Sequence, residues 1–189
     1  MLRTKNKMTK QKKINLGCGW DKKEEFINCD LHKEVNPDMI VDLEKSLPFK
    51  DNEIDYILID NVLEHITKQI KLINEMWRVC KSGAIILIKV PHYAHCGAWE
   101  DLTHKHPFAY RSLNFVCPET LSKKEFYTNA SYEYGIARFK IIKRKFLFSR
   151  LYRLLGISFF ANKHPAIFEQ FFAYHFAPHQ ILFKLEVLK

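Results

Sequence analysis

The sequence contains no uninterrupted apolar run long enough to cross a membrane. A membrane span needs about 20 mostly apolar residues, and the most apolar stretch, residues 154–176, is broken by Lys163, Pro165 and Glu169. The first apolar run, residues 14–16, is far too short for the core of a signal peptide. We therefore expect no transmembrane segment and no export signal.

The sequence also lacks paired cysteine motifs, internal repeats and low-complexity stretches. Its five cysteines are scattered, odd in number and without a C-x-x-C pair, which favours a reducing, cytoplasmic compartment. Hydrophobic residues make up 47% and charged residues 27% of the chain, a mixture typical of globular domains. With 189 residues, the chain has the length of one compact domain, and we expect a monomer or homodimer.

The formal net charge of +9 is concentrated in two patches. Residues 1–13 carry six Lys or Arg and residues 138–153 carry seven, and neither segment contains an acid. Such patches bind RNA, anionic substrates or membrane surfaces, although two solvated faces are the simpler interpretation. We predict a basic N-terminal tail over residues 1–12 and a single domain over residues 13–189.

Hydrophobic periodicity predicts an alternation of strands and helices. Short apolar runs predict buried strands at residues 13–16, 26–30, 39–42, 54–59, 84–91, 138–148 and 180–188. Helical spacing predicts helices at residues 62–80, 119–127 and 166–176. This order predicts an α/β fold, a Rossmann-like three-layer sandwich with a mostly parallel sheet and an antiparallel C-terminal strand.

A glycine turn and three acids follow the predicted strands. Gly17 and Gly19 come after the first strand, and Asp30, Asp42 and Asp60 each end a later one. Because ligands of parallel sheets bind at the carboxyl ends of the strands, we expect these groups to line one crevice. Glycines allow close backbone approach, and a carboxylate accepts hydrogen bonds from ribose hydroxyls, so the pattern favours a nucleoside. Caps of a following helix or turn are the alternative role for the last two acids.

The connection between the first two strands is unusually short. Only residues 20–25 separate the glycine turn from the second strand, whereas a parallel crossover usually needs a dozen residues or more. The first helix is therefore expected to be missing or reduced to a turn. The spacing also excludes the G-x-G-x-x-G fingerprint of dehydrogenases, which opens a full helix.

Several segments, in this order, resemble the class I S-adenosylmethionine-dependent methyltransferases. They are residues 14–19, 28–30, 42–43 ahead of 47–49, 54–56, 61–66, and Gly83 before 90–91. The resemblance covers residues 12–92. The short connection between the first two strands resembles that of a small subgroup of these methyltransferases.

The resemblance implies S-adenosylmethionine as the cofactor. The residues that it places at the cofactor are Leu16, Gly17, Cys18, Gly19, Asp30, Leu31, Asp42, Leu43, Asp60 and Asn61. The glycines would lie along the methionine part, Asp30 would hold the ribose hydroxyls, and residues 42–43 would meet adenine. Residues 60–61 would border the methyl group. The pair Glu64-His65 falls inside the predicted helix, so we interpret it mainly as packing and positioning.

Residues 92–118 are rich in His, Tyr, Trp and Pro and are predicted to form an acceptor loop. Methyl transfer is an in-line displacement that needs alignment and, for some nucleophiles, a base. The candidates for base or acceptor-orienting roles are His92, Asp101 and His104, and the candidate substrate contacts are Tyr93 and Arg111. For each of them, a hydrogen-bonded loop residue is an equally good interpretation.

The same loop contains residue types that bind zinc. His92, His95, Cys96, His104 and His106 offer imidazole and thiolate ligands, but their spacing matches no firm zinc motif. We therefore expect no metal.

The favoured function is methyl transfer from S-adenosylmethionine to an oxygen or nitrogen of a small or medium-sized metabolite, with residues of about 138–178 as a lid or substrate wall. An RNA methyltransferase that uses the basic patches is the less favoured alternative, because the acceptor loop lacks the Asn/Asp-Pro-Pro-aromatic motif. Basic patches beside the cofactor cleft would favour RNA. A further alternative is a non-catalytic cofactor-binding or interaction module, with residues 151–176 as a partner or membrane-surface patch.

Overall fold

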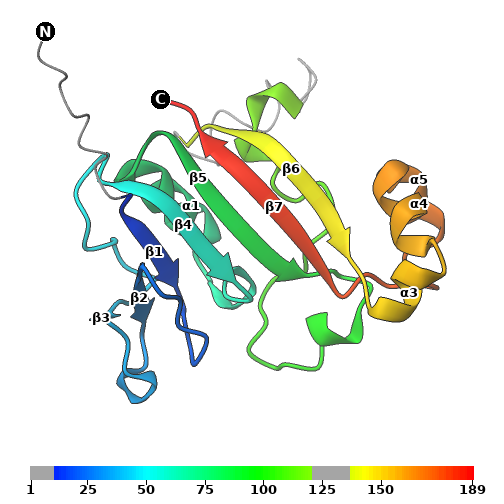
Figure 1. Cartoon of the computed structure of the whole chain (residues 1–189), viewed down its shortest axis with the longest axis horizontal. Helices are drawn as coiled ribbons and strands as arrows, with labels where there is room; N and C mark the ends of the chain where they lie inside the picture. Colours follow the sequence, from blue (N-terminus) through cyan, green and yellow to red (C-terminus); the bar gives the residue numbers. More distant parts are fainter. Residues whose placement is uncertain (1–10, 121–136) are drawn as a thin grey trace, which may run out of the picture.

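The computed structural model describes residues 11–120 and 137–189, which contain one seven-stranded sheet (Figure 1). The strands are β1 (Lys13–Leu16), β2 (Phe26–Asp30), β3 (Met39–Ile40), β4 (Ile54–Asp60), β5 (Cys80–Pro91), β6 (Phe139–Leu147) and β7 (Gln180–Val187). They lie in the order β3-β2-β1-β4-β5-β7-β6. Neighbours among β1 to β5 pair in parallel, and β7 pairs antiparallel with β5 and β6. The predicted mostly parallel sheet with an antiparallel C-terminal strand is confirmed.

Helices lie behind the sheet and beyond the end of β6 (Figure 1). The α-helices are α1 (Gln69–Val79), α3 (Arg150–Leu154), α4 (Ile157–Lys163) and α5 (Pro165–Phe171). Short 3-10 helices are η1 (Lys33–Val35), η2 (Leu63–His65), η3 (Cys96–Ala98), η4 (Asn114–Val116) and η5 (Pro118–Thr120). None of the described helices is long and apolar enough to cross a membrane.

The predicted helix over residues 62–80 is wrong at both ends. Residues 63–65 form the separate turn η2, α1 begins only at Gln69, and Cys80 already belongs to β5. Ile66 is extended, which interrupts the helix. The carboxylate of Glu44 accepts hydrogen bonds from the backbone N–H groups of Thr67 (2.6 Å) and Lys68 (3.2 Å) and so supports the start of α1 from outside the segment.

The C-terminal predictions hold for the strands better than for the helices. Strands β6 and β7 confirm the predictions for residues 138–148 and 180–188, whereas α5 covers only the first part of the helix predicted over 166–176. Helices α3 and α4 were not predicted. Of the helix predicted over residues 119–127, the structure describes only the end of η5, and the remainder lies outside the described residues.

Strands β1 and β2 pair directly although no helix connects them. Lys13 lies opposite Phe26 in the register, and residues 17–25 form turns, as the short spacing predicts. The Asn28 side-chain oxygen accepts hydrogen bonds from the amide of Asn15 (3.2 Å) and the backbone N–H of Lys23 (2.8 Å). A small amide network thus fixes the connection where a helix would ordinarily pack.

The two faces of the sheet are unequally covered within the described chain. On β5 and β7 the side chains of Ile86, Ile88 and Phe183 are fully buried, whereas Ile85 and Leu87 on the opposite face are half-buried. Asn15 of β1 and Leu58 of β4 lie on the same face as Leu87 but are buried, so the thinner cover lies over β5 rather than beside the short connection.

Arg78 of α1 joins the helix to the segment before β4. Its guanidinium donates to the carbonyl oxygens of Leu47 and Phe49 (both 3.0 Å), to Asp51 (2.7 Å) and, bidentately, to Glu75 (both 2.8 Å). A lysine ammonium cannot reproduce this planar fork.

We predict that Arg78→Lys destabilises the fold by about 2 kcal/mol, because several of these bonds are lost and two carbonyls lose their donor. For a chain of this size, thermal unfolding should shift down by roughly 4–8 °C. The exposed Arg150→Lys is the matched control. Equal melting temperatures for the two variants would show that this fork does not stabilise the protein.

Candidate active site

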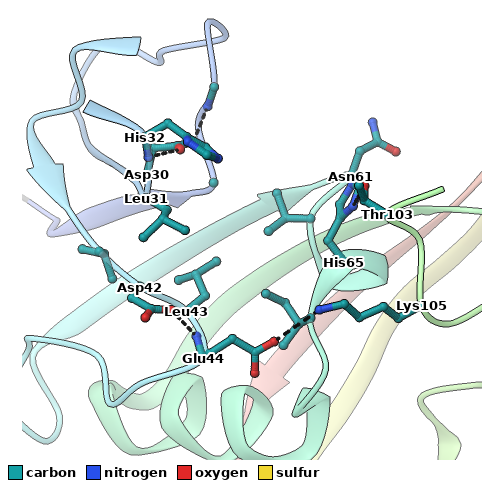
Figure 2. Close-up of a pocket in the computed structure, with 15 residues that line it drawn as sticks. Asp30, Leu31, His32, Asp42, Leu43, Glu44, Asn61, His65, Thr103 and Lys105 are labelled. Atoms are coloured by element: carbon teal, nitrogen blue, oxygen red, sulfur yellow. Dashed lines mark hydrogen bonds and ion pairs between the residues drawn. The ribbon is translucent and has the colours of Figure 1, made fainter. Parts of the chain in front are cut away.

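A cavity of about 530 Å³ lies where β1, β2 and β3 end, beside the segment that follows β4 (Figure 2). It is lined by Gly17, Gly19, Asp30, Leu31, His32, Val41, Asp42, Leu43, Glu44, Asn61, Val62, His65, Ile66, Thr103 and Lys105. Its volume is within the roughly 300–1,000 Å³ typical of small-molecule pockets. We call it the main pocket.

The structure brings most of the predicted cofactor residues to the main pocket. Gly17, Gly19, Asp30, Leu31, Asp42, Leu43 and Asn61 line it. Cys18 and Asp60 line a neighbouring cavity of about 260 Å³, which shares Gly17 and Asn61 with the main pocket. Leu16 is buried in the core and lines neither cavity. Two of the three strand-end acids therefore share one pocket, and the third lies in the adjoining cavity.

The glycine turn needs both of its glycines, for different reasons. Gly17 has a φ of +66°, and a Cβ built on it would lie 2.4 Å from Cγ2 of Val62. Gly19 has a φ of +49°, but its Cβ position is open. The backbone N–H of Gly19 donates a hydrogen bond to Asp30 (2.8 Å). One glycine thus allows close packing against the β4 loop, and the other turns the chain toward β2.

Asp30 holds the turn and still faces the pocket. Its second carboxylate oxygen accepts a hydrogen bond from the backbone N–H of His32 (2.9 Å), and the residue is 8% exposed. Next to it, Leu31 is 55% exposed although it is large and apolar. An apolar side chain at the rim of a pocket is the surface that a ligand would cover.

The other two acids have structural partners as well. Asp42 accepts a hydrogen bond from the backbone N–H of Glu44 (3.0 Å), which lowers the pKa of Asp42 together with a bond from Lys45. The turn-capping alternative therefore applies to Asp42, which also lines the main pocket. Asp60 forms an ion pair with Lys89 of β5 (2.5 Å).

The candidates at the start of the acceptor loop are held in place by α5. His92 is fully buried; its Nδ1 accepts from the backbone N–H of Ala94 (3.1 Å), and its Nε2 bonds to Glu169 (3.2 Å). The Tyr93 hydroxyl donates to the backbone oxygen of Glu169 (3.4 Å). Arg111 is exposed, and none of these candidates lines the main pocket. This geometry favours a positioning role for His92.

Asp101 and His104 lie closer to the main pocket, behind the pocket residue Thr103. Asp101 accepts hydrogen bonds from the backbone N–H (2.8 Å) and hydroxyl (2.7 Å) of Thr103, which lower the pKa of Asp101. His104 bonds through Nδ1 to the carbonyl oxygen of Ala98 (3.1 Å), and its Nε2 lies 3.9 Å from Asp101.

Sequence reasoning missed the pocket wall opposite the acids. His65, Thr103 and Lys105 form it (Figure 2), with Glu64 buried behind them. Burial raises the pKa of Glu64 to about 7, and burial beside His104 lowers the pKa of His65. The pair Glu64-His65 was the available signal, but the helical period assigned it to the wrong element.

The histidines and cysteine considered as a zinc set do not come together. Among the described residues, one group of side chains has the composition and spacing to hold a metal ion: Glu64, His65 and His104. It shares only His104 with the set considered from the sequence.

We predict that Gly17→Ala destabilises the protein more than Gly19→Ala does. Both substitutions place an L residue at positive φ, which costs roughly 1–2 kcal/mol, but only the first also forces Val62 aside. Thermal unfolding of the two variants measures the difference. A larger effect at Gly19 would contradict the packing role of Gly17.

Comparisons with known proteins agree with this geometry. Residues 10–88 match a family model described as a methyltransferase domain, and a search of curated proteins finds no match. A S-adenosylmethionine-dependent methyltransferase from Archaeoglobus fulgidus is 16% identical, with a TM-score of 0.62 over 93% of this chain and 86% of that one. One from Mesorhizobium loti is 12% identical, with a TM-score of 0.54 over 93% and 90%. The [4+2]-cyclase SpnF is 16% identical, with a TM-score of 0.55 over 94% and 75%.

At these identities the solved structures establish the fold, while the family model covers the segment that carries the glycine turn and all three strand-end acids. Residues 10–88 thus resemble a methyltransferase domain, and the chain has the Rossmann-like fold seen in these S-adenosylmethionine-dependent methyltransferases.

Proposed function

We propose that the protein transfers the methyl group of S-adenosylmethionine to an oxygen or nitrogen of a small or medium-sized metabolite. The observation that carries this proposal is the main pocket, in which the glycine turn, Asp30 and Asp42 meet at the carboxyl edge of the sheet. S-adenosylmethionine supplies an electrophilic methyl group on a sulfonium. The protein's task is then to align that group with the acceptor.

The residues of the main pocket fit the adenosine part of the cofactor. Asp30 faces the pocket and can accept hydrogen bonds from ribose hydroxyls beside those it already accepts from the backbone. Leu31 and Leu43 provide apolar walls for adenine, with Asp42 at its edge. Gly17 has no Cβ to collide with Val62, so the turn stays packed against this second residue of the pocket lining.

The adjoining cavity fits the methionine part. It is lined by Cys18, Asp60 and Asn61 and meets the main pocket at Gly17 and Asn61. Carboxylate and amide groups there can bind the ammonium and carboxylate of the methionine. Leu16 supports the turn from the core and has no ligand contact in this proposal.

The acceptor side is assigned to the loop after β5. We place His104 and Asp101 nearest the methyl group, because Thr103 and His65 beside them line the main pocket. His92, Tyr93 and α5 form the wall behind, since Glu169 joins them. This contact supports the expectation that residues of about 138–178 form a substrate wall. Arg111 is exposed and does not line the main pocket, so in this proposal it contacts only a large acceptor.

The charges around the main pocket favour a small acceptor over RNA. Of the residues that line the pocket, one is a Lys or Arg, namely Lys105. Its ammonium donates to the Thr67 hydroxyl (2.6 Å) and lies 3.8 Å from the Glu44 carboxylate. Three acids, Asp30, Asp42 and Glu44, line the same pocket. A polyanion is bound by clustered cations. The main pocket is instead lined mostly by acids among its charged residues.

The second basic patch also lies away from the main pocket. It runs along β6 at the sheet edge opposite β3 and β2. Arg144 within it donates to Tyr110 and Asn114 (both 2.7 Å) and stacks on the Tyr110 ring, so it serves the fold. Of the first patch, Lys12 and Lys13 pair with Glu53 and Glu25, and residues 1–10 lie outside the described part.

An interaction module is the second candidate, because the C-terminal helices expose many apolar side chains. The exposed ones are Leu151, Leu154, Leu155, Phe159, Phe160, Ile167, Phe171, Phe172, Tyr174 and Phe176. A module would bind S-adenosylmethionine without methylating any acceptor. Location in the cytoplasm and a monomeric or homodimeric state stay predictions.

We predict that Asp30→Ala weakens S-adenosylmethionine binding by at least about 30-fold, because bonds from two hydroxyls to a charged acceptor are lost. Isothermal titration calorimetry measures this, with the exposed Glu34→Gln as the matched control. Asp30→Asn tests the carboxylate with less effect on the turn. Unchanged affinity in both Asp30 variants would remove the ribose role.

The acceptor class is tested with methyl-labelled S-adenosylmethionine and cell extract separated into small molecules and RNA. We predict that the label appears in the small-molecule fraction and that Asp30→Ala abolishes this transfer. His104→Ala should reduce the transfer by a larger factor than it reduces the affinity for S-adenosylmethionine. Label in the RNA fraction alone would establish the alternative acceptor. Binding without transfer to either fraction would support the module.

A further inference from the structure

Glu64 is a buried acid without a partner. Its residue is 1% exposed, and neither carboxylate oxygen has a hydrogen-bond partner in the described chain. Buried charges in proteins are normally paired or bound to a metal, because desolvation of a lone carboxylate is costly. This side chain therefore calls for a positive group that the described residues do not supply.

Two histidines stand beside that carboxylate. One ligand atom each from Glu64, His65 and His104 lies within 4.8 Å of the other two. The two imidazole rings are 4.6 Å apart between centroids and are inclined by 70°. Ligand atoms around a tetrahedral zinc ion are roughly 3.3 Å apart, given bond lengths of about 2.0 Å. Small side-chain adjustments would therefore bring the three atoms onto one ion.

The hydrogen bonds of both histidines leave the same nitrogen free. The Thr103 hydroxyl donates to Asp101 (2.7 Å), so toward His65 (2.8 Å) it acts as the acceptor of the Nδ1 proton. The Nδ1 proton of His104 goes to the carbonyl oxygen of Ala98 (3.1 Å). Each ring then keeps an unprotonated Nε2. Metal-binding histidines are typically oriented in this way, with the other ring nitrogen bonded to a carbonyl or to a carboxylate-linked group.

We propose that Glu64, His65 and His104 bind a first-row divalent cation such as Zn²⁺. Two imidazoles and one carboxylate suit zinc or cobalt better than magnesium, which prefers oxygen ligands. This proposal departs from the expectation of no metal, which considered a different set of residues.

The position of the site gives the ion a role in the pocket. His65 and Thr103 line the main pocket across from Asp30 and Asp42 (Figure 2). Three protein ligands leave a fourth coordination position for water or substrate. That position would orient an oxygen or nitrogen of the acceptor, a consequence that rests on the proposed function.

The test is metal binding by untagged, chelator-treated protein in the absence of S-adenosylmethionine, so its outcome is independent of the methyltransferase activity. Equilibrium dialysis with micromolar Zn²⁺ should show one equivalent per chain, and Zn²⁺ should raise the melting temperature where Mg²⁺ does not. Co²⁺ should give the visible absorption of a tetrahedral site.

The variants Glu64→Gln and His104→Ala should lose this equivalent and the thermal shift, whereas the exposed His106→Ala should keep both. The Glu64 variant retains the shape of the side chain, and circular dichroism of both variants verifies the fold. Retention of zinc by Glu64→Gln, loss of zinc by His106→Ala, or no zinc binding by the parent protein would each overturn the proposal.

Discussion

The hydrogen bond from the backbone N–H of Gly19 to the carboxylate of Asp30 is the constraint on which the site depends. It ties the end of β1 to the end of β2 across a connection too short for a helix. The contact of Gly17 with Val62 ties the same turn to the segment after β4. Three strand ends are thereby held together, and the main pocket is the space that they enclose.

A shortened connection changes more than the turn itself. With no helix between β1 and β2, an amide network centred on Asn28 fixes the connection. The opposite end of the sheet is reinforced instead. There, β7 inserts antiparallel between β5 and β6, and Glu169 of α5 anchors both His92 and the backbone of Tyr110.

The cofactor side of the site was predictable because its signals are local. The apolar run that ends at Asp30 locates the end of β2, and the run before Asp42 contains β3, which ends two residues earlier at Ile40. Parallel pairing brings such strand ends to one edge of the sheet. The antiparallel C-terminal strand was also predicted, whereas the order of the strands in the sheet was not. Asp60 shows the limit of this reasoning, since its ion pair with Lys89 and its place in the adjoining cavity depend on side-chain geometry.

The acceptor side was less predictable, because its residues are brought together by irregular backbone. The extended Ile66 separates Glu64-His65 from α1, and no hydrophobic period reveals such a break. Thr103 and His104 reach the same wall through a loop without any period. Candidates chosen there by residue type, such as His92 and Arg111, were therefore scattered between the buried wall and the surface.

The central claim is that one S-adenosylmethionine spans the main pocket and the adjoining cavity around the glycine turn. A crystal structure of the protein with S-adenosylhomocysteine, the demethylated cofactor, tests it most directly. The account predicts ribose hydroxyls within hydrogen-bond distance of Asp30, adenine between Leu31 and Leu43, and the sulfur beside Gly17 and Asn61. A nucleoside bound elsewhere, or ribose turned away from Asp30, would contradict the account.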